Sequence, residues 1–173
     1  MRLIKILSKK KFFFKKIQKS DLIILDNNFS NLRFKNIKSH IFDPDRYYIR
    51  EFIISLFKYV GSLFSKRFGL IYFKTLIEKI NPKIALGHDA TDYIFNFKKL
   101  FPDKISVCYQ FAYIFKDDIV NYKKRFGKKI SDYYFAYDKR SEKIMKNFIK
   151  SNYIINGSTK VNENLPVKMK KKI

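Results

Sequence analysis

Hydrophobic residues in this chain form short continuous runs, separated by stretches with helical spacing. Asp21–Asp26 is one such run, with four aliphatic residues between two acids. Runs that are apolar at every position are typical of parallel strands buried on both faces. We predict strands at Asp21–Asp26, Ile37–Phe42, Ile84–Leu86, Ile105–Gln110, Tyr133–Tyr137 and Tyr153–Ile155.

The segments between these strands carry apolar residues three or four positions apart, which predicts amphipathic helices. Helices are expected at Tyr47–Val60, Arg67–Lys79, Asp92–Leu100 and Lys139–Ile149. Strands that alternate with helices in this order predict an α/β fold. We expect a Rossmann-like open, mostly parallel sheet with helices on both faces.

The two ends of the chain differ from this central α/β pattern, which covers residues 20–163. Residues 1–19 form a basic, aromatic segment, predicted either as an amphipathic helix on an anionic membrane or as a first helix packed on the sheet. Residues 164–173 form a basic tail that we expect to be disordered. Residues 111–130 show no clear period, and connections of that length tend to be functional or mobile.

The formal net charge of +23 has two explanations. One is a polyanionic partner, either a nucleic acid or an anionic membrane surface. The other is codon bias, because Lys, Asn, Ile, Phe and Tyr are abundant and Trp is absent. Arg is much rarer than Lys, although Arg is preferred for bidentate phosphate and base contacts. We therefore favour codon bias and do not expect nucleic acid as the partner.

Several function classes are disfavoured by missing motifs. The chain has no glycine-rich nucleotide loop, no Gly-x-Ser-x-Gly elbow and no Cys or His cluster for zinc. We expect neither a cofactor nor a metal. Cys108 lies in an apolar run and is expected to be a buried thiol in a reducing compartment. No apolar stretch reaches the ~20 residues of a membrane span, and no signal peptide is recognised, so we expect a cytoplasmic protein.

The remaining candidates for chemistry follow the predicted strands. His88 and Asp89 follow one strand, and Gln110 ends the next. Gly157, Ser158, Thr159 and Lys160 follow the last. The carboxyl ends of parallel strands meet at one edge of a sheet, where α/β proteins bind ligands. His88 and Asp89 are either a base with its orienting acid or a helix-capping turn. The amides of residues 157–159 either bind a phosphate or form an ordinary turn.

Short motifs in this order resemble those of another group of proteins. Asp21–Asp26 looks like a "DIVIFD" strand, and Asn81–Leu86 like a "KPK" turn and strand. His88–Thr91 stands in the place of an "IDN" turn, and Ser106–Gln110 is similar to a strand that ends in "QNG". Gly157–Asn162 is similar to a "GSFRNN" turn. The chain thereby resembles the N-terminal half of bacterial surface carbohydrate biosynthesis proteins, a glycosyltransferase-like group with the GT-B architecture.

This resemblance implies a glycosyltransferase-like protein of surface polysaccharide or O-antigen synthesis. We expect it in the cytoplasm, either free or peripherally bound to the inner face of the membrane. It would be a truncated first, acceptor-side domain, and an active enzyme would need a separately encoded second domain. Asp89 would be the catalytic residue, as a base or by orienting the acceptor hydroxyl, and His88, Gln110 and residues 157–160 would bind a nucleotide-sugar or a lipid-linked acceptor. The alternative is a catalytically silent fragment or a membrane-surface interaction protein, because Phe111 and Ala112 replace the Asn-Gly of the "QNG" motif.

Overall fold

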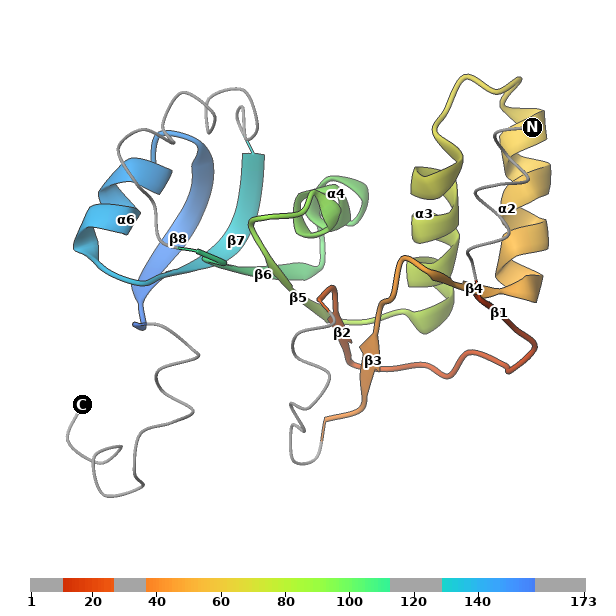
Figure 1. The fold of residues 1–173 in the computed structure, drawn as a ribbon, viewed down its shortest axis with the longest axis horizontal. Helices are drawn as coiled ribbons and strands as arrows, with labels where there is room; N and C mark the ends of the chain where they lie inside the picture. Colours follow the sequence, from red (N-terminus) through yellow and green to blue (C-terminus); the bar gives the residue numbers. More distant parts are fainter. Residues whose placement is uncertain (1–10, 27–36, 113–128, 158–173) are drawn as a thin grey trace. The chain divides into compact units, whose positions relative to one another are not determined.

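The structure, a computed structural model, describes residues 11–26, 37–112 and 129–157 (Figure 1). The chain divides into two compact units, Met1–Ala85 and Leu86–Ile173. Within the described residues, six strands form one sheet in the order β3-β2-β5-β6-β7-β8. The pairs β2–β3, β6–β7 and β7–β8 are all parallel. The fold is therefore α/β with a mostly parallel sheet, as the sequence predicted, and it is consistent with a Rossmann-like arrangement.

The first unit combines two strands of the large sheet with a helical hairpin. Its elements are β1 (Lys11–Phe13), β2 (Leu22–Ile24), β3 (Ser39–Ile41), β4 (Arg46–Tyr48), α2 (Ile49–Gly61) and α3 (Phe68–Ile80). Helices α2 and α3 lie side by side (Figure 1). The core of this unit is formed by β2 and the inner side of α3, where Phe73 meets Phe42 edge to face at 5.3 Å between ring centroids.

The second unit carries the strand ends that the sequence singled out. Strand β5 (Ile84–His88) leads into it, and α4 (Tyr93–Leu100), β6 (Ile105–Tyr109), β7 (Lys129–Ala136), α6 (Lys139–Met145) and β8 (Ile149–Ile155) follow. Cys108 and Tyr134 are fully buried on neighbouring strands and pair in register. Burial also raises the pKa of the Cys108 thiol, which agrees with its predicted structural role.

Three local predictions were wrong. Lys11–Phe13 is a strand, not part of a helix, because it pairs in parallel with β4. Tyr47 is the register partner of Phe12 in that pair and belongs to β4, so α2 begins only at Ile49. Helix α6 ends at Met145, because Ile149 and the residues after it pair with β7 instead. Residues 1–10, most of the connection 111–130 and the tail 164–173 lie outside the described residues.

Candidate functional site

Asp89 lies directly after β5 and joins three strand ends of the second unit. Its side chain is only 7% exposed. One carboxylate oxygen accepts a hydrogen bond from the backbone N–H of Phe111 at 3.0 Å, and the other accepts one from the hydroxyl of Tyr134 at 2.5 Å. Burial, and then the negative charge of Asp89, raise the pKa of Tyr134 far above its usual value. Tyr134 is therefore a neutral donor to a buried carboxylate.

His88 is held in the same turn by its own backbone. Its Nδ1 accepts a hydrogen bond from the N–H of Ala90 at 3.0 Å, so the ring proton of the neutral imidazole is on Nε2. The ring lies 4.7 Å from that of Phe111, between centroids. Helix α4 begins after Asp92, whose side chain makes no capping hydrogen bond. His88 thus folds the turn after β5, while no side-chain cap starts α4.

Gln110 is almost completely buried at the end of β6 and is hydrogen-bonded at both ends of its amide. Its Nε2 donates to the carbonyl of Ala112 at 2.8 Å and to the hydroxyl of Ser141 at 3.2 Å. Its Oε1 accepts the backbone N–H of Tyr137 at 2.9 Å. Both donors and the acceptor are thus used within the chain. The side chain fixes the segment after β6 to the turn between β7 and α6.

Asp138 starts α6 in the same region. Its carboxylate accepts the backbone N–H of Ser141 at 2.7 Å, which is an N-cap, and this bond holds the pKa of Asp138 below its ordinary value.

Gly157 follows β8 with a left-handed φ of 67°, a conformation that suits glycine. Ser158, Thr159 and Lys160 lie outside the described residues.

The structure therefore brings Asp89, Gln110 and Phe111 together, and it uses their polar groups to hold loops in place. A general base needs an oxygen that can reach a substrate hydroxyl. Both oxygens of Asp89 accept hydrogen bonds from within the protein instead. The catalytic role of Asp89 and the binding roles of His88, Gln110 and Gly157 stay predictions. Among the described residues, no group of three His, Cys, Asp or Glu side chains is placed to hold a metal ion.

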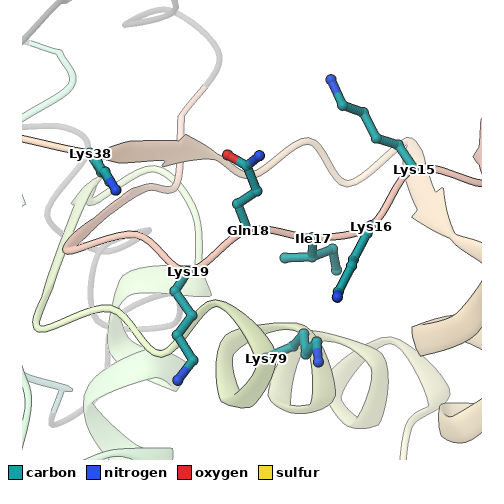
Figure 2. A pocket seen from close by; sticks show the side chains of 7 residues that line it. All are labelled: Lys15, Lys16, Ile17, Gln18, Lys19, Lys38 and Lys79. Atoms are coloured by element: carbon teal, nitrogen blue, oxygen red, sulfur yellow. The ribbon is translucent and has the colours of Figure 1, made fainter.

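A groove in the first unit is a feature that the sequence analysis missed. Figure 2 shows the side chains that line it, and its volume is about 800 Å³. Its lining is five lysines, one glutamine and one isoleucine: Lys15, Lys16, Ile17, Gln18, Lys19, Lys38 and Lys79. We call this feature the lysine groove. None of the described residues that line it carries a carboxylate, so every charge among them is positive.

The groove is built by the irregular segment between β1 and β2. Ile17 is 5% exposed and anchors that segment in the core, and the N–H of Ser20 donates to the carbonyl of Ile80 at 3.2 Å. Figure 2 shows Lys16 and Lys19 extending from the segment toward the side on which α3 carries Lys79. Lys15 and Gln18 extend to the opposite side. Three ammonium groups from two elements therefore share one side of the groove.

Neighbouring acids do not neutralise this charge. Asp21 pairs with Lys83 at 3.1 Å, and Glu78 pairs with Lys58 and Lys74 at 3.4 and 3.8 Å. In the part of the chain that the structure describes, none of the five groove lysines forms an ion pair with a carboxylate. Such a cluster raises the local concentration of anions and favours phosphate groups as ligands.

A second groove, of about 640 Å³, lies in the other unit and is electrostatically different. Two of its lysines are paired: Lys98 with Asp132 at 2.7 Å, and Lys129 with Asp92. Lys129 also lies 4.9 Å from the centroid of the Phe95 ring. This groove therefore has less unpaired charge to offer an anion than the lysine groove.

The sequence contained part of the signal for the lysine groove. Lys15, Lys16 and Lys19 belong to the basic segment of residues 1–19, which the sequence analysis predicts as a helix. Lys38 and Lys79 come from elsewhere in the chain, and only the fold brings them to that segment. No protein-family model matches the chain, and no curated protein or solved structure matches it.

Proposed function

We propose that this chain is a glycosyltransferase-like α/β protein that holds a diphosphate-bearing ligand in the lysine groove. The observation that carries the proposal is the set of five groove lysines without a carboxylate partner among the described residues. Nucleotide-sugars and lipid-linked acceptors both carry adjacent phosphates. Each phosphate presents several acceptor oxygens to ammonium donors.

The glycosyltransferase class is supported by the motif resemblance and by the parallel α/β sheet. A fold alone does not determine activity, because function depends on the site grafted on it. The role of the lysine groove would be to bind and orient the phosphates of the ligand. The main role of the strand-end residues Asp89 and Gln110 would be to support the adjoining loops. Direct contact with the ligand would be a secondary role.

The experiment is a calorimetric titration with inorganic pyrophosphate, UDP-glucose and UMP as probes. We expect pyrophosphate and UDP-glucose to bind, and UMP to bind more weakly because it has one phosphate. The triple variant K16Q/K19Q/K79Q should weaken binding of the diphosphates by about ten- to a hundredfold, at about 0.5 to 1 kcal/mol for each exposed contact.

A matched control removes the same charge elsewhere. Lys139, Lys143 and Lys150 are exposed residues of α6 and β8, so K139Q/K143Q/K150Q loses three charges without touching the groove. The control should bind pyrophosphate nearly as well as the unmodified protein does. Equal losses in both triple variants would mean that net charge alone attracts the anion, and the groove assignment would then be abandoned.

Binding of a ligand would not by itself show that the protein takes part in sugar transfer. The expected result is transfer of the sugar to a lipid-linked acceptor when the chain is combined with a partner domain that carries the rest of the site. Pyrophosphate binding without any sugar-nucleotide or acceptor preference would argue against the glycosyltransferase class. It would leave the lysine groove as a general anion site.

A further inference from the structure

Helix α2 buries polar residues and exposes apolar ones, which is the reverse of the usual arrangement in a surface helix. Its buried residues are Glu51 and Ser55, which are both polar. The exposed residues include Phe57, with 75% of its surface accessible, and four aliphatic side chains: Ile53, Ile54, Leu56 and Val60. At 100° per residue, Ile53, Leu56, Phe57 and Val60 fall on one side of the helix, opposite Glu51 and Ser55. In a water-soluble helix the apolar side normally faces the core.

The apolar surface continues beyond the end of α2 into the turn before α3. Leu63 is 85% exposed and Phe64 is 63% exposed. Both residues have a left-handed backbone, with φ of 49° and 61°. That conformation costs a bulky residue energy that Gly or Asn would largely avoid. The turn is nevertheless well bonded, because the N–H of Leu63 donates to the carbonyl of Val60 at 2.9 Å and the Ser62 hydroxyl donates to that of Tyr59 at 2.7 Å. The turn thus holds two large apolar side chains outward.

The charges around this surface have one sign. Between Ile49 and Arg67 the only acidic residue is Glu51, which is 4% exposed. Arg50, Lys66 and Arg67 are exposed in the same stretch. Lys58 is also basic, but it pairs with Glu78 of α3 and is therefore not counted among these cations. Basic side chains beside an apolar helix side are the features that bind a helix to the interface of an anionic bilayer.

We propose that the apolar side of α2 and the turn after it form a docking surface for an anionic lipid bilayer. We define this docking surface by Ile53, Leu56, Phe57, Val60, Leu63 and Phe64. The aliphatic and aromatic groups enter the region between headgroups and acyl chains, and Arg50, Lys66 and Arg67 contact lipid phosphates. Described residues on this stretch offer a bilayer no exposed carboxylate to repel it. A continuous apolar surface rimmed by cations fits this partner better than it fits water.

This docking surface differs from the membrane helix that the sequence suggested in residues 1–19. Lys11–Phe13 of that segment form β1, and the docking surface lies on α2. The proposal is independent of the lysine groove. None of the groove-lining residues belongs to the docking surface.

The chain has no tryptophan, so a single Trp reports on one position only. In F64W, we expect a blue shift of the emission with vesicles of equal parts phosphatidylcholine and phosphatidylglycerol, and quenching by brominated acyl chains. Y133W is the control, because Tyr133 is 39% exposed on β7 of the other unit and should show neither effect. F14W tests the competing anchor, because Phe14 is 89% exposed beside Lys15 and Lys16. Quenching in F14W but not in F64W would overturn the proposal.

A second pair of variants separates binding from folding. L63N/F64N removes two apolar side chains and places Asn where the backbone is left-handed, so its unfolding midpoint should equal or exceed that of the unmodified protein. Its partition onto the anionic vesicles should fall about tenfold or more. The control I154N/I155N replaces two adjacent exposed isoleucines of β8 and should bind as the unmodified protein does.

A charge variant and lipid composition give the last arm of the experiment. K66Q/R67Q should weaken binding to the anionic vesicles. On pure phosphatidylcholine, binding should be weak for the unmodified protein too, so the variant should change it little. Retention of full vesicle binding by L63N/F64N would overturn the proposal. So would burial of the docking surface between two copies of the chain, seen as a stable dimer by light scattering that L63N/F64N dissociates.

Discussion

The buried hydrogen bond between Tyr134 and Asp89 provides the sharpest test of how the second unit is held together. We predict that Tyr134→Phe destabilises the fold by about 1.5 to 3 kcal/mol. The substitution leaves the aromatic ring in its place and removes only the hydroxyl that donates to the carboxylate at 2.5 Å. Tyr134 is fully buried and Asp89 is 7% exposed, so water cannot easily replace the lost donor.

The magnitude follows from the charge on the acceptor. A hydrogen bond to a charged group contributes about 1.5 to 3 kcal/mol, and a neutral one about 0.5 to 1.5 kcal/mol. Tyr153→Phe is the matched control, because the Tyr153 hydroxyl donates to the neutral carbonyl of Ile149 at 2.8 Å. Y134F should therefore cost about twice as much as Y153F. Asp89→Asn should cost only about 1 kcal/mol, because the amide keeps an acceptor for the N–H of Phe111 and gives Tyr134 a donor instead.

The assay is urea unfolding followed by circular dichroism, with hydrogen exchange at the backbone N–H of Phe111 as a local readout. That N–H donates to Asp89, so its exchange should accelerate in Asp89→Ala and change little in D89N. If Y134F costs no more than Y153F, and Phe111 exchanges at the same rate in D89A as in the unmodified protein, the carboxylate does not hold these strand ends. Asp89 would then regain its place as a candidate for catalysis.

Three further predictions concern other parts of the fold. The pKa of Asp132 lies below its ordinary value of 3.8, because hydrogen bonds from Lys98 and Ser106 together outweigh the opposing effect of burial. Its contribution to stability is therefore complete above about pH 4 and is lost as the pH falls through the lowered pKa, so Asp132→Asn should flatten the acid unfolding curve in that window. Gly69→Ala should stabilise α3 by about 0.5 to 1 kcal/mol, measured as a raised urea midpoint, because a Cβ there meets no atom within 4 Å. Asp138→Ala should destabilise the fold by about 1 kcal/mol through loss of the α6 cap, measured as a lowered urea midpoint, and Asp138→Asn should restore most of that stability.

The parallel sheet could be predicted because its strands carry a purely local signal. Ile23 and Ile24 are completely buried in β2, and each lies in a run that is apolar at every position. The helices α2 and α3 were also predicted within two residues of their observed ends. Periodicity identified the apolar side of α2 correctly, but not its surroundings. A sequence pattern shows which residues share a side of a helix, and it does not show whether protein or solvent covers that side.

Elements that depend on pairing with distant residues could not be predicted in the same way. Strand β1 exists because Lys11–Phe13 pairs with β4, more than thirty positions along the chain. Similarly, Ile149 satisfies the helical period of α6 but becomes the first residue of β8. In both cases the backbone pairing of a strand overrides a local preference. The polar network of Gln110 was hidden for the same reason, because its partners Ala112, Tyr137 and Ser141 meet only in the folded chain.

Polar groups are buried at the strand ends and apolar groups are exposed on α2, and this contrast separates structural from interacting surfaces. Asp89 and Gln110 were the most suggestive residues of the sequence, yet both are buried and hydrogen-bonded within the chain. The sequence predicts compositional bias for the lysines and an ordinary amphipathic helix for α2, yet both regions carry exposed charge or hydrophobicity that the described residues do not offset. Burying an unpaired polar group and exposing a large apolar surface both cost free energy in water. The strand ends avoid the first cost by internal pairing, and α2 would avoid the second on the proposed bilayer. The binding partners are therefore to be sought at the lysine groove and at α2 before the strand ends.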